Sequence, residues 1–330
     1  LEDRPVPSLF DGEILVKMMA SGICGTDVMQ WYRQKKSPRV LGHEMSGEIA
    51  EVGQGVTQFK KGDRVFVSHH VPCGTCHYCR EGNSTACESL HTGNYDPGGF
   101  SEYIRVPREN VERGTFLLPP EISYEAAAMI EPLACVLCAQ ERIGIEQNQR
   151  VLVIGSGVSG LLHIQTAKHR GATVIATDIN EYRMRKAIEY GAYHVFNATV
   201  YSPDKLKQLM GSRGAERVIV CAGAPQAIDH ATASVERRGV ILFFAVPGEE
   251  ITLPSMQLWR NEITVTFSYG AAPEDIRKAI ALIKDKTVKA EEMITHRIPL
   301  SSAGEGFRLV SDAGECLKIV IVPDESLLIS

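Results

Sequence analysis

The sequence has no excess of positive charge and no long apolar run. Its 330 residues contain 35 Lys and Arg against 40 Asp and Glu, which gives a formal net charge of −5 at pH 7. Because no basic surplus is present to meet phosphate groups, this balance argues against nucleic acids and anionic membranes as partners. Apolar runs such as 240–246 are much shorter than the roughly 20 residues that span a bilayer. We therefore expect a chain that binds neither nucleic acid nor membrane.

The sequence also lacks the features of a secreted, disulfide-bonded protein. No positively charged segment followed by an apolar one, the pattern of a signal peptide, opens the chain. The nine cysteines are an odd number, and without a secretion signal they indicate reduced thiols and metal ligands. We therefore expect a cytoplasmic location. The length is sufficient for two domains, each with its own core.

Two short segments in the first part of the chain combine sulfur, nitrogen and oxygen donors. Gly-Ile-Cys-Gly-Thr-Asp covers residues 22–27, and Gly-His-Glu covers residues 42–44. Zinc binds this mixture of donors, and a catalytic zinc keeps one position open for substrate. The adjacent glycines let the backbone approach a metal closely. The segments predict a catalytic zinc site with Cys24, His43 and Glu44; the alternative is a buried cysteine and an unrelated His-Glu pair.

A second group of cysteines follows the pattern C-x2-C-x2-C-x7-C over the segment 73–87. Four thiolates at this spacing can surround one zinc ion tetrahedrally and leave no open position, which defines a structural site. Two local disulfides are the alternative, but the redox context and the strain of bridging such close neighbours disfavour them. We predict structural zinc ligands at Cys73, Cys76, Cys79 and Cys87. The preceding His69 and His70 are interpreted as ordinary loop or core residues.

Glu131 is a charged residue inside the otherwise apolar segment 126–139. Because a buried carboxylate without a partner is costly, we expect a partner for it. Pro132 suits the end of one helix and the first position of the next, so the carboxylate could point into a cleft. The functional interpretation is a zinc ligand, or a group hydrogen-bonded to water on the zinc. The alternative is a partly exposed glutamate at a helix joint.

Further along, the composition changes to a regular alternation of apolar strands and helices. Residues 150–154 predict a buried strand, Gly155–Gly160 match G-x-G-x-x-G, and a helix follows to about residue 169. Between a strand and a helix this loop is typical of dinucleotide binding, because amide groups at the helix N-terminus meet the pyrophosphate. The alternation continues to about residue 267 and predicts a doubly wound parallel sheet.

The predicted second strand of this region ends at Asp178, at the distance from the glycine-rich loop that is typical of the acidic residue in dinucleotide-binding folds. Its carboxylate would accept hydrogen bonds from the adenosine ribose and repel a 2′-phosphate, so the sequence favours NAD over NADP. The nearby Arg183 could weaken this preference. The full set of predicted cofactor-binding residues is Gly155, Gly157, Val158, Ser159, Gly160, Asp178, Arg183, Cys221, Ala222 and Val246.

The fold class predicted from these patterns is α/β, with a β-rich domain beside the parallel sheet. Short β-branched segments and glycine-containing turns between positions 12 and 67 indicate the β-rich domain. We place it at 1–133, including the four-cysteine lobe at 73–87, and place the nucleotide-binding domain at 134–268. Residues 269–330 contain helical segments and a final strand, and we expect them to return to the first domain.

Taken together, these motifs resemble the zinc-containing medium-chain dehydrogenase/reductase family. The resemblance rests on residues 22–27, 42–44, the four-cysteine lobe, Glu131-Pro132 and Gly155–Gly160, which cover both domains. It implies a GroES-like catalytic domain and a Rossmann domain, with the site in the cleft between them. The sequence of residues 129–135, Met-Ile-Glu-Pro-Leu-Ala-Cys, is most similar to that of the polyol (sorbitol or iditol) dehydrogenase branch. Two departures concern the substrate pocket, where Ser268-Tyr269 replaces an Arg-Tyr pair and Gln30 replaces an aromatic residue.

The resemblance implies two zinc ions per chain, NAD as cofactor, and a homo-oligomer, either a tetramer or a dimer. Cys24, His43 and Glu44 would ligate the catalytic zinc, with Glu131 bound directly or through water. The expected reaction transfers a hydride between a secondary alcohol, in the first place a polyol, and NAD. Thr26 could relay the alcohol proton toward the cofactor ribose; its alternative is a local turn hydrogen bond.

Other functions stay open on the sequence alone. The same chemistry could act on 2,3-butanediol, threonine or a phosphorylated sugar alcohol. A zinc-ribbon nucleic-acid binder built on the four-cysteine lobe is disfavoured by the acidic balance and the dinucleotide loop. A non-catalytic sensor would bind NAD without turnover and would not need Cys24, His43 or Glu44.

Overall fold

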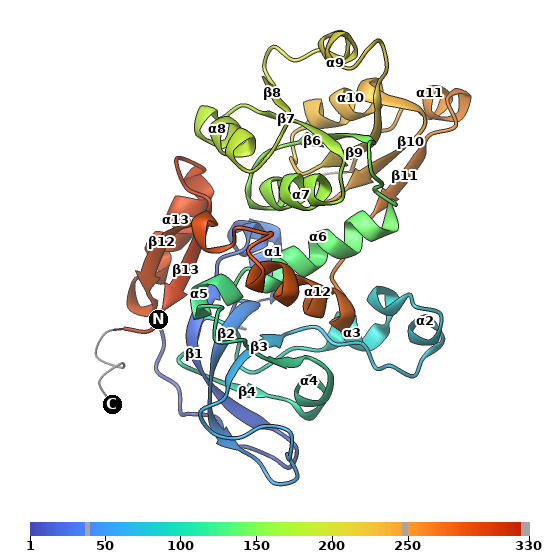
Figure 1. The fold of residues 1–330 in the computed structure, drawn as a ribbon. Helices are drawn as coiled ribbons and strands as arrows, with labels where there is room; N and C mark the ends of the chain where they lie inside the picture. The colour runs from blue at the N-terminus through green and yellow to red at the C-terminus, as the bar shows by residue number, and fades with distance from the viewer. Residues whose placement is uncertain (37–39, 246–249, 325–330) are drawn as a thin grey trace. The chain divides into compact units, whose positions relative to one another are not determined.

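The computed structural model describes residues 1–36, 40–245 and 250–324 (Figure 1). Val246, which we predicted to contact the cofactor, lies outside the described residues. The chain forms two compact units, residues 1–134 with 270–330 and residues 135–269. Each unit has its own apolar core and is described by itself.

The first unit is built on a seven-stranded sheet with the order β12-β13-β1-β2-β3-β5, in which β4 pairs additionally with β1. Its strands are antiparallel to their neighbours except for β12 and β13, which are parallel. The strands are β1 (Ile14–Gly22), β2 (Glu44–Val52), β3 (Arg64–Ser68), β4 (Tyr103–Val106), β5 (Thr115–Leu117), β12 (Ile294–Pro299) and β13 (Lys318–Val322). Alternating apolar residues of these strands, among them Ile14, Val16 and Met18, form the core of the unit.

Short helices connect these strands. The α-helices of the first unit are α1 (Gln30–Lys36), α2 (His77–Arg80), α3 (Glu88–Thr92), α4 (Arg108–Arg113), α5 (Tyr124–Ala127), α12 (Pro273–Lys284) and α13 (Ala303–Asp312). Single 3₁₀ turns are η1 (Gly25–Val28), η2 (Ser84–Ala86), η3 (Glu291–Met293) and η4 (Leu300–Ser302). Helix α6 (Ile130–Arg142) begins in the first unit and continues into the second.

The last strand of the chain lies beside the first one. β13 pairs with the end of β1, where Ser21 is opposite Ile321 and Gly22 is opposite Val320. On its other side the same end of β1 pairs with the start of β2, and Gly22 is opposite Glu44. Gly22 therefore has a strand on each side. As a result, the residues at the end of β1 and at the starts of β2 and β13 are brought together.

The second unit is a six-stranded parallel sheet with the order β11-β10-β9-β6-β7-β8. Its strands are β6 (Arg150–Ile154), β7 (Thr173–Asp178), β8 (His194–Asn197), β9 (Ala215–Val220), β10 (Val235–Phe243) and β11 (Thr264–Phe267). The helices are α7 (Val158–His169), α8 (Glu181–Glu189), α9 (Pro203–Leu209), α10 (Pro225–Ser234) and α11 (Ser255–Arg260). Because β6 pairs with both β7 and β9, the strand order reverses at β6, where doubly wound sheets bind ligands. The predicted Rossmann class is confirmed.

No helix within the described residues is long and apolar enough to cross a membrane.

A buried polar pair lies between α6 and α7 in the second unit. Gln140 and His163 are both fully buried. The Gln140 amide nitrogen donates to the backbone oxygen of His163 at 2.9 Å and lies 2.8 Å from Thr166 Oγ1. Burial lowers the pKa of His163 to about 3. The folded unit therefore keeps this imidazole neutral at pH values where the unfolded chain would protonate it.

This depressed pKa predicts that the second unit loses stability in acid. The stabilisation is present above the unfolded pKa of about 6.5 and declines as the pH falls toward 3, by up to roughly 4 kcal/mol. Replacing His163 with Leu should flatten the dependence of Tm on pH in this window, as measured by thermal unfolding. The exposed His169 on the same helix is the control, because H169L should keep the wild-type dependence. Equal slopes for wild type and H163L would contradict the prediction.

Candidate active site

Cys24, His43 and Glu44 come together at the three strand ends beside Gly22. Cys24 follows β1, His43 immediately precedes β2, and Glu44 is its first residue. One ligand atom of each residue lies within 4.8 Å of those of the other two. A thiolate, an imidazole and a carboxylate at this separation fit the donor set of a zinc ion. The structure thus places the three predicted ligands in one group.

Two glycines allow this close packing of strand ends. Gly42 has φ +95°, and a Cβ atom there would lie 2.7 Å from the Phe100 nitrogen and 2.8 Å from the Gly99 carbonyl carbon. A Cβ atom on Gly22 would lie 2.6 Å from Lys318 Cε. Neither position can hold a larger residue without displacing its neighbours.

Asp27 orients two members of the group, a role that our sequence analysis did not assign. Its side chain is fully buried, and its Oδ2 accepts a hydrogen bond from the Cys24 backbone nitrogen at 3.0 Å. Its Oδ1 lies 3.6 Å from His43 Nδ1. Carboxylates in this position hold metal-binding histidines in one orientation. The signal was present in the sequence as the last residue of Gly-Ile-Cys-Gly-Thr-Asp.

The electrostatic field of the group favours a cation. Burial by itself lowers the pKa of His43, but the hydrogen bond to Cys24 and the charges of Cys24, Asp27 and Glu131 outweigh it and raise the pKa to about 10. An imidazole that holds a proton this tightly reports a strongly negative environment. The same environment would attract a divalent metal ion.

Glu131 and Thr26, two predicted catalytic residues, lie around this group. Glu131 is half-buried in the first turn of α6, and its charge acts on both His43 and Tyr95. It is not part of the group whose ligand atoms lie within 4.8 Å of one another. Thr26 lies in η1 between Cys24 and Asp27. Their roles stay predictions.

His69, which we had interpreted as an ordinary residue, lies beside His43 and contacts two further rings. The ring of His69 is 5.1 Å from that of His43 and 3.7 Å from that of His70. Tyr95 packs edge-on against His69 at 6.3 Å and is buried. Burial and the charges of Glu131, Asp27 and Glu44 raise the pKa of Tyr95 well above its usual value. Its hydroxyl therefore stays protonated and can donate a hydrogen bond.

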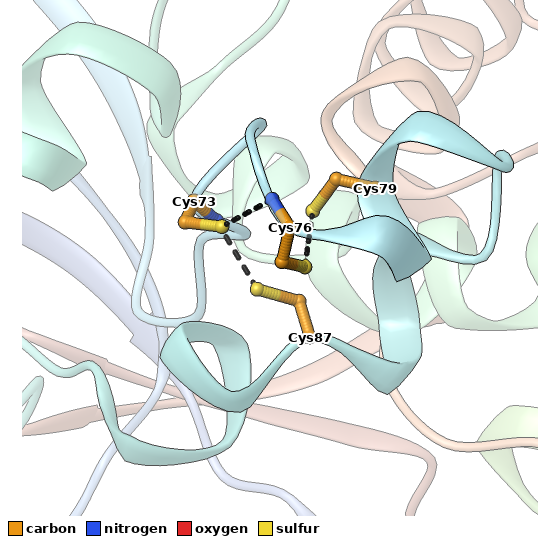
Figure 2. A group of neighbouring side chains, drawn as sticks. All are labelled: Cys73, Cys76, Cys79 and Cys87. Carbon is orange, nitrogen blue, oxygen red and sulfur yellow. Dashed lines mark hydrogen bonds between the residues drawn. The ribbon is translucent and has the colours of Figure 1, made fainter.

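The four cysteines of the lobe turn their sulfur atoms toward one another (Figure 2). These atoms lie within 4.8 Å of one another. The Cys76 nitrogen donates to Cys73 Sγ, and the Cys73 nitrogen donates to Cys87 Sγ, both at 3.3 Å. None of the four cysteines forms a disulfide. The arrangement fits the predicted closed zinc site.

Hydrogen bonds from a side chain and from the backbone already stabilise part of the negative charge in this lobe. Hydrogen bonds from the Thr75 side chain and backbone and from the Cys76 backbone lower the pKa of Cys73 to about 5. Burial and the neighbouring thiol of Cys76 raise the pKa of Cys79 to about 12. One thiolate is thus ready at neutral pH, and a metal ion would be needed to hold all four sulfurs deprotonated.

The glycine-rich loop lies between β6 and α7, as predicted. Gly155 has φ +92°, and a Cβ atom there would lie 3.0 Å from Ala222 Cβ. A Cβ atom on Gly160 would lie 2.9 Å from the Gly155 carbonyl carbon. Gly157 is the residue before α7, and the nearest atom to a Cβ atom placed on it would be Arg183 Nη1 at 4.0 Å. The first and third glycines are required by packing, while the second leaves the space that a pyrophosphate needs.

Asp178 and Arg183 both lie beside this loop. Asp178 ends β7 and is buried; its Oδ2 accepts from the Ser156 nitrogen at 2.6 Å, and its Oδ1 accepts from the Asn180 nitrogen at 2.8 Å. Backbone amides therefore fix the carboxylate against the loop. Cys221 follows β9 and is close to Gly155; burial raises the pKa of its thiol to about 12, despite a bond from Ser159. The described members of the predicted cofactor set share one end of the sheet.

Comparison with known proteins identifies the family of the chain. Residues 10–115 match the alcohol dehydrogenase GroES-like domain, and residues 159–285 match the zinc-binding dehydrogenase family. The chain is 33% identical to sorbitol dehydrogenase of Bacillus subtilis (strain 168), with 98% of this chain and 94% of the relative covered. It is also 33% identical to L-threonine 3-dehydrogenase of the same strain, with the same coverage.

A solved structure shows the same likeness in three dimensions. It is a protein of Sinorhizobium meliloti 1021, described as a zinc-binding dehydrogenase and bound to NADP. The TM-score is 0.85 at 29% identity, with 96% of this chain and 94% of that chain covered.

The fold, the family matches and the relatives together show a zinc-dependent dehydrogenase that uses a nicotinamide cofactor. The chain belongs to the zinc-containing medium-chain dehydrogenase/reductase family, in its sorbitol dehydrogenase-like branch. The predicted family, fold class and enzyme class are confirmed.

Proposed function

We propose that the protein transfers a hydride between a secondary alcohol, in the first place a polyol, and NAD. The observation that carries this proposal is the group of Cys24, His43 and Glu44, whose ligand atoms lie within 4.8 Å of one another. A chain that only bound a dinucleotide would not need this group. The sorbitol dehydrogenase relative supports a polyol as substrate.

We assign the two predicted zinc ions to the two groups described above. Bound at Cys24, His43 and Glu44, zinc would supply Lewis-acid catalysis, and the nicotinamide would exchange the hydride. The protein contributes the ligands themselves and the buried Asp27, which orients His43. Glu131 supplies a further negative charge close to the group. The four-cysteine lobe would hold the second ion without catalysing the reaction.

NAD is proposed in preference to NADP because of Asp178. Its carboxylate is fixed by two backbone amides at the end of β7, where it would meet the adenosine ribose. A 2′-phosphate would bring negative charge toward a buried carboxylate. Arg183 is the competing influence, since its guanidinium reaches the same loop, and the relative with bound NADP supports the other cofactor.

Thr26 is proposed to relay the alcohol proton. It lies in η1 between Cys24 and Asp27. Replacing Thr26 with Ala should lower kcat by about 10²-fold, the lower range for loss of a group that transfers a proton, while the zinc content stays unchanged. T26S keeps the hydroxyl and should keep most of the turnover. Full turnover in T26A, measured with the best alcohol substrate, would exclude Thr26 from the relay.

The experiment that tests the proposed function is nicotinamide reduction across a panel of alcohols. NAD and NADP are compared with polyols, inositols, vicinal diols, threonine and ethanol, each with and without a zinc chelator. We expect NAD reduction with one group of polyols, abolished by the chelator. Turnover with no alcohol, despite bound zinc and NAD, would overturn the proposal and favour a cofactor sensor.

Threonine is the second candidate substrate. The observation in its favour is the threonine dehydrogenase relative, which is as similar to this chain as the sorbitol dehydrogenase relative. The residues after Glu131-Pro132 are Leu133-Ala134, which favours the polyol branch. The same panel of alcohols separates the two.

We also propose that the protein is a cytoplasmic homo-oligomer. None of its nine cysteines forms a disulfide, which suits a reducing compartment.

The surface that supports an oligomer lies in the second unit. Strand β11 is at the edge of the parallel sheet. Large apolar side chains on α11 and at the end of β11 are exposed, with Trp259 76% and Phe267 54% accessible. An open strand edge beside exposed apolar residues is a surface that a second copy could cover. Sedimentation velocity would determine the oligomeric state, and a monomer would contradict the proposed homo-oligomer.

A further inference from the structure

The last strand of the chain carries a buried lysine at its start. β13 has the sequence Lys-Ile-Val-Ile-Val, and Lys318 is 2% exposed. Its ammonium group is paired with Glu44 Oε2, and Glu44 is itself 1% exposed. The same Nζ donates to the backbone oxygen of Ile23 at 3.2 Å. A buried ammonium ion is costly without such partners.

Three features of the backbone bring this lysine to Glu44. β13 and β2 pair with β1 from opposite sides, and both pairings include Gly22. The Ile23 nitrogen donates to the Ile319 oxygen at 2.9 Å, which extends the contact beyond the end of β1. Gly22 then leaves the space for the ion pair, because a Cβ atom there would lie 2.6 Å from Lys318 Cε and 3.0 Å from Nζ. The pair is thus built into the sheet.

The position of the pair has a consequence for the metal-binding group. Glu44 has two carboxylate oxygens, and Lys318 occupies one of them, while a ligand atom of Glu44 also lies within 4.8 Å of those of Cys24 and His43. Metal-binding carboxylates are commonly held by a hydrogen bond to the oxygen that does not face the metal. Cys24, Glu44, Asp27 and Glu131 would together supply four negative charges, and Lys318 offsets one of them.

We propose that Lys318 is a positioning residue of the catalytic metal site, which holds one oxygen of Glu44 so that the other is presented to the metal. This inference rests on the proposed function, because it takes Cys24, His43 and Glu44 as the zinc ligands. It makes the last strand of the chain a part of the metal site, although that strand contains none of the predicted ligands.

The test is metal affinity at the catalytic site in a double-mutant cycle. Wild type, K318M, E44Q and K318M/E44Q are compared by competition with a chelator, using zinc and cobalt(II), whose visible absorption reports the ligands directly. K318M should lower the affinity by about 10- to 100-fold, the usual effect of losing a group that holds a ligand, and should change the cobalt spectrum. In the E44Q background the same replacement should have little effect, because Lys318 acts through Glu44.

The control for the loss of a buried cation is Arg150, which pairs with Glu216 at 3.1 Å in the second unit and has a side chain only 10% exposed. R150M should lower stability and leave the cobalt spectrum unchanged. K318M with wild-type affinity and spectrum would overturn the inference. An equal loss of affinity in both Glu44 backgrounds would also overturn it. If K318M does not fold, K318Q takes its place in the cycle, because its amide side chain is neutral but still polar and of similar length, and the same outcomes apply.

The outcomes for the inference and for the proposed function are distinguishable. Metal binding to the wild-type group without turnover of any alcohol would overturn the proposed function alone. The double-mutant cycle could then still be evaluated from the metal affinities and the cobalt spectra. Failure of wild type to bind cobalt at Cys24 would overturn both.

Discussion

Replacing Cys24 with Ala is expected to abolish turnover and to remove one zinc ion per chain. Cys24 is the one sulfur donor in the group with His43 and Glu44. A catalytic metal stabilises the transition state by several kcal/mol, and each 1.36 kcal/mol is tenfold in rate, so kcat should fall by at least about 10³-fold. The measurement combines metal analysis of the purified protein with NAD reduction on its best alcohol.

The matched control is Cys138, a half-buried cysteine of α6 outside both groups of predicted metal ligands. C138A should keep the zinc content and turnover of wild type. A C24A variant that retains both zinc ions and its turnover would show that the catalytic metal lies elsewhere. A variant that loses the metal but keeps its turnover would favour chemistry without zinc.

Those parts of the site that depend on local spacing could be predicted from the sequence. The four cysteines of the lobe all lie in the short segment 73–87, so their chemistry and separation already indicate a closed site. The glycine-rich loop also depends only on short-range spacing, because its turn, the glycine that leaves space for a phosphate group and the start of the helix are adjacent in the chain. For the same reason the order of strands and helices in the second unit was predictable.

The parts that the sequence analysis missed depend on contacts between distant segments. Lys318 pairs with Glu44, which is 274 residues away in the sequence, and no local pattern predicts this partner. The one available signal was a single charge in an otherwise apolar strand, the same kind of signal that identified Glu131. Likewise, the sheet brings His69 to His43, and the chain that follows the lobe brings Tyr95 to His69; neither contact follows from the spacing in the sequence.

The start of strand β10 is an example of a strand boundary that polar residues make difficult to predict. The apolar run in this part of the sequence covers 240–246, whereas the strand already begins at Val235. Val235 pairs with Ala215, but the next pairing is Val240 with Arg217, so the register shifts between them. Arg238, within this interval, has φ +59°. An irregular, charged start of this kind does not show the apolar run by which buried strands are recognised.

Replacing Cys76 with Ser is expected to unfold the four-cysteine lobe without removing the catalytic metal. Three sulfurs cannot complete a closed tetrahedral site, and the lobe has little else to hold it, since α2 is a single short turn with no buried residue. Because binding of a structural zinc is coupled to folding, the local loss of stability should be on the order of 5 kcal/mol. The exposed Arg80 of α2 provides the measurement, since trypsin should cleave after it in C76S and not in the zinc-bound wild type.

The control for this variant is Cys316, a buried cysteine of the same unit whose thiol bonds to the Leu309 oxygen at 3.4 Å. C316A loses a buried sulfur without losing a metal ligand, so it should remain resistant at Arg80 and keep both zinc ions. C76S should lose one zinc ion per chain and keep the cobalt spectrum of the Cys24 group, because the two groups share no ligand. Full zinc content together with protection of Arg80 in C76S would mean that the lobe is held by its own hydrogen bonds, and the assignment of a structural zinc would then be wrong.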